Sequence, residues 1–286
     1  MSSSRQTKRP PAVAGMFYPE SPKELQTLID HSFRDARFGP GRAPPSENRR
    51  RIYGIVSPHA GYVYSGAVAA NGFYEVSSFD FQNVIMVGPN HYGIGSGVAT
   101  MREGVWETPL GGVGVNSELS LEVSKRSGLI DFNDFSHSRD HCLEVQLPFL
   151  QYSRSDFQIV PVILMMQDID TAFDLGKAIA ETITERARND TLLIASSDLT
   201  HYEPNPDAHR KDGELIRAIL ALDVHKFYSV LERLDVSACG YGAIASIMIA
   251  AKSLGATRGE LLRYATSGDV TGDKNAVVGY SSIVFV

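Results

Sequence analysis

Four polar residues with metal-binding or acid–base side chains stand directly after short apolar runs of the chain. They are His59, His91, Asp198 and His201. If the apolar runs are neighbouring parallel strands, these side chains converge beyond the carboxyl ends of the strands, where open α/β sheets bind ligands. Imidazole and carboxylate groups in one crevice form a donor set suited to a divalent transition metal.

Cys239 is a further candidate for the same crevice, because it precedes a segment that the sequence predicts to be a helix, 240–254. The dipole and free N–H groups of a helix N-terminus favour a thiolate. Taken alone, Cys239 is explained as a small buried residue and Asp198 as a helix N-cap. A single histidine at a strand end is more often a hydrogen-bonded structural group than a ligand. The spacing matches no short metal motif, so the metal prediction depends on repetition at one topological position.

A second cluster contains His141 and Glu144, which are three residues apart and share one helix face if the segment is helical. This spacing is compatible with a metal site or an acid/base pair, but we favour a salt bridge at the start of a helix. Tyr62 could wall a pocket, although aromatic residues usually serve packing. The remaining histidines stand in polar surroundings and are expected to face water: His31, His137, His209 and His225.

The elements that must position these residues alternate between strands and helices from residue 51 onward. Strands are predicted at 52–57, 83–88, 158–165, 192–197, 261–266 and 277–286. Helices are predicted at 22–38, 65–76, 117–127, 142–151, 170–188, 207–222, 225–234 and 240–254, with a glycine-rich, hairpin-like segment at 93–115. This order predicts an α/β fold with a central mixed sheet and helices on both faces. With 286 residues, no repeat and no clear linker, we expect one domain over 9–286 and disorder in 1–8.

Composition limits the classes of partner. The net charge of −6 creates no field that favours nucleic acid or an anionic membrane. Lys and Arg gather in 5–9 and 49–51, where we expect solvated loops. No apolar run is long enough to cross a bilayer, and the first residues lack the apolar core of a signal peptide. Cys142 and Cys239 are therefore expected to be unpaired thiols in the cytoplasm.

Short motifs in a fixed order make the chain similar to the Memo family. They are PAVAGMFYP at 11–19, SPHAGY at 57–62, GPNH at 88–91, EVQLPFL at 144–150, SSDLTHY at 196–202 and TSGDVTGD at 266–273. Together they cover the chain from residue 9 to its end and are highly specific. Prokaryotic members resemble protein B of the AmmeMemoRadiSam system, so the resemblance implies AMMECR1-like and radical SAM proteins as partners.

The resemblance also implies a fold related to the LigB-type, class III extradiol dioxygenases, which use non-haem iron. It implies His59, His91 and Cys239 as metal ligands, with Asp198 and His201 lining the site in catalytic roles. Iron(II) is the expected metal, with zinc or copper as alternatives. His141, Glu144 and Tyr62 are then expected to line the pocket.

Animal members of the family are described as adaptors in receptor-driven motility that bind phosphotyrosine peptides, and as iron binders with a redox role. A phosphopeptide or small-molecule ligand is therefore an alternative partner, but nothing in this sequence indicates a receptor. The sequence departs from the family at Cys142, where serine is more common. A thiol is a weaker hydrogen-bond donor than a hydroxyl.

Enzymatic and non-enzymatic functions both fit these residues. Non-haem Fe(II) oxygenases use two histidines and a carboxylate, whereas the third position here is Cys239, and a thiolate beside iron and dioxygen is readily oxidised. This favours metal binding without assigned catalysis. The retention of many ionisable groups, with His201 or His141 as a base, favours an oxidoreductase instead. A metal-independent phosphopeptide- or protein-binding module is the third interpretation.

Overall fold

Parallel strands form the middle of the sheet and position the candidate site. The computed structural model describes residues 7–45, 51–186 and 190–286. The central strands are, in spatial order, β8 (Gln158–Leu164), β3 (Asn83–Pro89), β9 (Thr191–Ser196) and β2 (Gly54–Ser57). All of them pair in parallel. The strands that precede His59, His91 and Asp198 are therefore neighbours and run parallel, as predicted.

Further strands extend the sheet on both sides. Beyond β8 lie β6 (Gly111–Val115), β5 (Val105–Thr108) and β1 (Lys8–Arg9), and beyond β2 lie β12 (Val277–Phe285) and β10 (His201–Glu203). β11 (Gly259–Thr266) pairs with β12, and β4 (Val98–Thr100) joins β8 to β7 (Ile130–Phe132). Because β12 runs antiparallel to β2, the sheet is mixed, as predicted.

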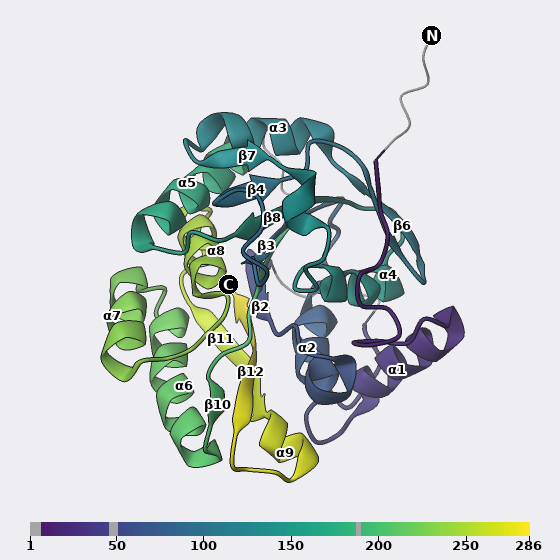
Figure 1. The fold of residues 1–286 in the computed structure, drawn as a ribbon, viewed down its shortest axis with the longest axis vertical. Coiled ribbons are helices and arrows are strands. Elements are labelled where there is room, and N and C mark those ends of the chain that lie inside the picture. The colour runs from purple at the N-terminus through teal and green to yellow at the C-terminus, as the bar shows by residue number, and fades with distance from the viewer. Residues whose placement is uncertain (1–6, 46–50, 187–189) are drawn as a thin grey trace.

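Helices cover both faces of the sheet (Figure 1). One hydrophobic cluster contains residues of α3 (Ser117–Arg126), α5 (Ile169–Glu185), α6 (Asn205–Leu220), α7 (Val224–Leu234) and α8 (Tyr241–Ser253). The other contains residues of α1 (Pro22–Arg34), α2 (Tyr62–Val76) and α4 (Leu147–Ser153). The short elements are α9 (Ser267–Thr271) and the 3-10 turns η1 (Asp134–His137) and η2 (Glu144–Gln146). Within the described ranges, no helix is long and apolar enough to cross a membrane.

Successive side chains of the central strands point alternately into these two clusters. In β9, Leu193 and Ala195 belong to the first cluster, whereas Leu192 and Ile194 belong to the second. Side chains of a strand point alternately to opposite faces, so a strand covered on both sides must be apolar throughout. This is why β3 and β9 appear in the sequence as continuous apolar runs.

Several predictions of local structure need correction. The first helix ends at Arg34 rather than at residue 38, because Asp35 accepts hydrogen bonds from the next backbone amides and starts a turn. The helix predicted over 142–151 is the turn η2 followed by α4, since Pro148 lies in the first turn of α4. Disorder was expected in 1–8, of which residues 1–6 lie outside the described ranges. The expectation is wrong for Thr7, whose carbonyl accepts from the amide of Val105, and for Lys8, which pairs with Val105 in the sheet.

Candidate metal site

Three donor atoms, one each from His59, His91 and Cys239, lie within 4.8 Å of one another. Sγ of Cys239 is 3.0 Å from Nε2 of His59. The rings of His59 and His91 are perpendicular, with centroids 5.0 Å apart. His59 and His91 follow β2 and β3, and Cys239 lies just before α8. These are the three residues that the family resemblance implies as metal ligands.

Hydrogen bonding determines which nitrogen of His59 carries its proton. Nδ1 lies 3.0 Å from Oγ of Ser196. That hydroxyl donates to the Cys142 carbonyl at 2.6 Å and accepts from Nε2 of Gln146 at 2.8 Å. Because a hydroxyl has only one proton, Nδ1 of His59 must be the donor to Ser196. Nε2 therefore presents a lone pair toward Cys239.

Asp140 orients His91 in a similar way. Its Oδ1 is 3.1 Å from Nδ1 of His91, and its Oδ2 accepts from the His91 backbone N–H at 2.7 Å. Burial opposes ionisation, but the hydrogen bonds and charge of His91 hold the pKa of Asp140 well below its usual range. A carboxylate only accepts, so Nδ1 of His91 donates and Nε2 is left for a ligand. Asp140 was not predicted from the sequence, although its place directly before His141 was an available signal.

His141 completes a cluster of three rings, which we call the histidine cluster (His59, His91 and His141). Its ring stacks on His91 at 4.6 Å, meets His59 edge-on at 5.3 Å and contacts Phe17 at 4.5 Å. Burial and the neighbouring imidazoles lower the pKa of His141 to about 3. Burial also lowers the pKa of His59 well below its ordinary value. Both rings are therefore neutral near pH 7, the state in which imidazole binds metals.

The environment of Cys239 differs from the sequence-based expectation. Its Sγ accepts from the Asp198 backbone N–H at 3.3 Å, and α8 begins two residues later. Burial, followed by the charge of Asp198, raises the pKa of the Cys239 thiol. The thiolate expected from the helix position is therefore not favoured by the protein alone. A bound metal ion would displace this proton, because thiolate is the ligating form.

Asp198 and His201 lie beside the donor group rather than within it. Oδ1 of Asp198 accepts from the backbone N–H of His59 at 2.9 Å, and burial raises its pKa. Nδ1 of His201 is 2.7 Å from the carbonyl of Leu199, so it donates there and leaves Nε2 free. His201 lies near enough to His59 to contribute to its lowered pKa. The ring contacts of His59, however, are with His91 and His141.

Glu144 and Tyr62 were expected to line the pocket. Their polar atoms instead make hydrogen bonds to residues outside the histidine cluster. Glu144 is fully buried and pairs with Arg9 at 2.6 Å, not with His141. Its carboxylate also accepts from the hydroxyl of Tyr18 and from the amides of residues 12 and 13. The Tyr62 hydroxyl donates to the carbonyl of residue 145 at 2.6 Å. Glu144 thus anchors the N-terminal segment that contains Phe17.

Three further expectations concern the remaining histidines, Arg9 and the two cysteines. His137, expected to face water, is buried beside Trp106, whereas His31, His209 and His225 are exposed as predicted. Arg9, expected in a solvated loop, is buried as well.

Cys142 and Cys239 are both unpaired, as predicted. The Cys142 thiol donates to the carbonyl of residue 89 at 3.2 Å.

Comparison with known proteins shows similarity to one family over nearly the whole chain. A family model described as "Memo-like protein" matches residues 9–284. A "MEMO1 family protein" of Nitrosopumilus maritimus is 51% identical over 279 residues, covering 97% of this chain and 99% of the relative. MEMO1 family proteins of Methanothermobacter thermautotrophicus and Methanopyrus kandleri are each 46% identical, covering 96% and 97% of this chain and 99% of each relative.

Proposed function

Because this chain belongs to the Memo family, we propose that it binds one divalent transition metal through His59, His91 and Cys239. The supporting observation is that donor atoms of these residues lie within 4.8 Å of one another. The fit is chemical as well as spatial, since Nδ1 of each imidazole is hydrogen-bonded away from the site and Nε2 of His59 lies 3.0 Å from Sγ of Cys239. Asp198 and His201 flank the ligands and are suited to hold water or a second ligand.

The donor set narrows the choice of metal. Mg²⁺ and Ca²⁺ prefer oxygen ligands, whereas two imidazoles and a thiolate select softer ions. Iron(II) is the proposed metal, zinc is its strongest competitor because two histidines and one cysteine suit an open zinc site, and copper is a third choice. When bound, such an ion would supply Lewis acidity or, for iron and copper, redox chemistry.

A non-haem iron oxidoreductase is the second candidate function, and His141 favours it. Its imidazole is neutral and stacks on His91, where it can hydrogen-bond to a substrate held beside the proposed ligands. Oxygen uptake by the iron-loaded protein with catechols separates the two functions. Ring-cleaved product supports an enzyme, and its absence supports metal binding alone. If no metal binds, a phosphopeptide-binding module becomes the alternative.

As part of the same proposal, the protein works in the reducing cytoplasm with AMMECR1-like and radical SAM proteins. The resemblance of prokaryotic Memo proteins to protein B of the AmmeMemoRadiSam system supports this, and the two unpaired thiols fit a reducing compartment. Affinity purification of the tagged chain from its own cells tests the partnership. Recovery without either partner would contradict it.

Anaerobic calorimetric titration with iron(II) and zinc salts tests the metal site. The wild-type protein is expected to bind one ion. His59→Ala, His91→Ala and Cys239→Ser should each weaken binding by more than about tenfold, since each removes a ligand. His31→Ala is the matched control, because His31 is an exposed histidine on α1. Equal affinity in all variants would place any metal elsewhere.

A further inference from the structure

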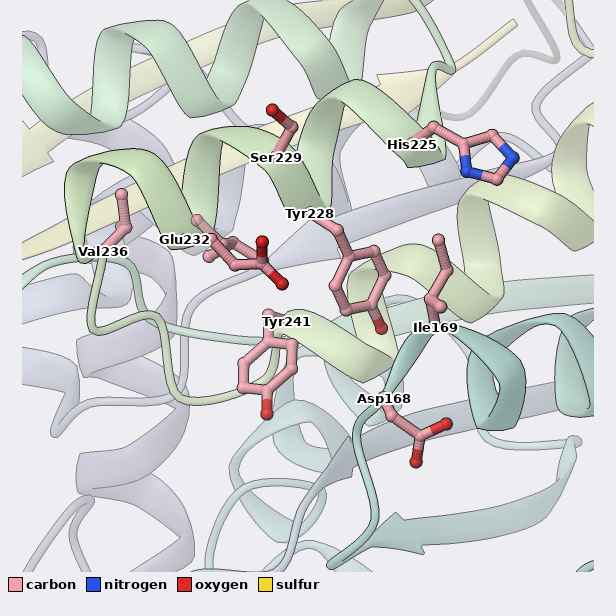
Figure 2. A pocket seen from close by; sticks show the side chains of 9 residues that line it. Asp168, Ile169, His225, Tyr228, Ser229, Glu232, Val236 and Tyr241 are labelled. Carbon is pink, nitrogen blue, oxygen red and sulfur yellow. The ribbon is translucent and has the colours of Figure 1, made fainter.

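A separate cavity of about 620 Å³ lies between the start of α5 and the helices α7 and α8. Figure 2 shows that its side chains come from these helices and from the loop residues that adjoin α5 and α7, and none of the three proposed metal ligands lines it. Tyr228 and Tyr241 form aromatic walls, with ring centroids 6.0 Å apart and planes at 88°. Ile169 and Val236 add apolar surface. The cavity therefore offers apolar and aromatic contact to a small molecule.

Two carboxylates give this cavity a negative charge. Asp168 accepts from the amide and the hydroxyl of Thr171 at 2.9 and 2.7 Å, which keeps its carboxylate ionised and lowers its pKa. Glu232 makes no ion pair with the residues that the structure describes, and the adjacent Arg233 pairs with Glu214 instead. Neither lysine nor arginine is among the described residues that line the cavity. His225 is the one imidazole among the described residues that line the cavity.

The two carboxylates are separated by aromatic surface. In Figure 2, Glu232 and Asp168 lie on opposite sides of Tyr228. An aromatic face attracts a cation, and it also covers the methylene groups of a chain that passes over it. We propose that this cavity binds a linear aliphatic diamine in its doubly protonated form, with an ammonium group at each carboxylate and the methylene chain between the tyrosine rings.

Calorimetric titration of the full-length protein with 1,4-diaminobutane tests this proposal. Binding should weaken as salt is added, because exposed charges are screened. 1,4-Butanediol, which has the same carbon chain and no charge, should not bind. This measurement does not depend on metal binding, so the failure of either proposal leaves the other open to its own test.

Charge-neutral variants test the role of each carboxylate. Asp168→Asn keeps a side-chain oxygen for the N-cap of α5, and Glu232→Gln changes an exposed residue of α7. Each variant should weaken diamine binding about threefold, and the double variant about tenfold. Asp131→Asn is the matched control, since Asp131 is an exposed carboxylate on β7.

Tyr241→Leu tests the aromatic wall and should also weaken binding. Tyr241 is preferred to Tyr228, because the Tyr228 hydroxyl donates to the carbonyl of Gln167 at 2.7 Å and Gln167 donates to the carbonyl of Cys239. Absence of heat with the diamine, or unchanged affinity in the double carboxylate variant, would overturn the proposal. Binding of a lysine-rich peptide without binding of the diamine would overturn it too, in favour of a protein-docking site.

Discussion

Sγ of Cys239 lies 3.0 Å from Nε2 of His59, although 180 residues separate them in the chain. Asp198 connects the two. Its backbone N–H donates to Sγ of Cys239, its carbonyl accepts from the Cys239 amide, and its carboxylate accepts from the His59 amide. Asp198 reaches both because it follows β9, which pairs with β2. Asp198 therefore holds two candidate ligands together through hydrogen bonds, independently of any catalytic role.

Ser196→Ala should weaken zinc binding by about 10- to 100-fold without removing a ligand. The change deletes the oxygen to which Nδ1 of His59 donates, so the ring loses its preferred tautomer and orientation. Ser246→Ala is the matched control, because this buried hydroxyl donates only to a carbonyl within α8. Titration calorimetry of both variants provides the measurement. Equal zinc affinity in the two would show that Ser196 does not orient His59.

The parts of the fold that were predictable are those buried on both faces. Continuous apolar runs identified β3 and β9, and the polar residues after them located His91 and Asp198 at one end of the sheet. Short elements were not predictable. β1, β7, β10 and α9 span two to five residues and are too short to show periodicity.

The surroundings of the site were less predictable than its ligands. His141 joins the ring cluster through an irregular segment between η1 and η2, where no repeating pattern indicates direction. Glu144 pairs with Arg9, 135 residues away, and such a contact leaves no local pattern in the sequence. Asp140 was overlooked because an acidic residue in a loop is usually solvated, whereas here it accepts three hydrogen bonds from His91 and Cys142.

Glu144→Gln and Arg9→Met should each destabilise the protein by about 3–5 kcal/mol, because each leaves a buried charge without its partner. Arg9 is 4% exposed and Glu144 is 0% exposed. The double variant should lose less than the sum of the two. Urea unfolding can be followed by fluorescence of the single tryptophan, Trp106, since the Arg9 guanidinium lies 4.1 Å from its ring. Strictly additive losses would mean that the two side chains do not act as a pair.

Acid should destabilise the metal-free protein through its buried histidines. Burial and the nearby Arg9 charge lower the pKa of His137 from 6.5 to about 3. Below about pH 6.5 the unfolded chain therefore binds a proton that the folded protein does not. Stability is complete above that pH and falls as the pH drops from 6.5 toward 3.

Replacing His137 isolates its contribution to the loss of stability in acid. His137→Leu should reduce the slope of unfolding free energy against pH by up to about 1.4 kcal/mol per pH unit between pH 6 and 4. His31→Leu, at an exposed histidine, should keep the wild-type slope. Urea unfolding at several pH values provides the measurement, and a wild-type slope in His137→Leu would refute the assignment.

The two thiols should differ in reactivity in the folded, metal-free protein. Cys142 is fully buried, whereas Cys239 is partly exposed. A thiol reagent should therefore modify Cys239 alone, and Cys142 only after denaturation. Because burial raises the pKa of the Cys239 thiol, its modification should be slow at pH 7 and accelerate about tenfold for each pH unit.

The effect of zinc on the reactivity of Cys239 tests whether this thiol belongs to the proposed metal site. Saturating zinc should protect Cys239, since a ligating sulfur is no longer free to attack the reagent. The folded Cys239→Ser variant should react with no equivalent of reagent, and the denatured, unreduced wild type with two. Fast modification of two thiols in the folded protein would contradict the burial of Cys142. Unchanged modification of Cys239 in the presence of saturating zinc would show that its sulfur is not a ligand.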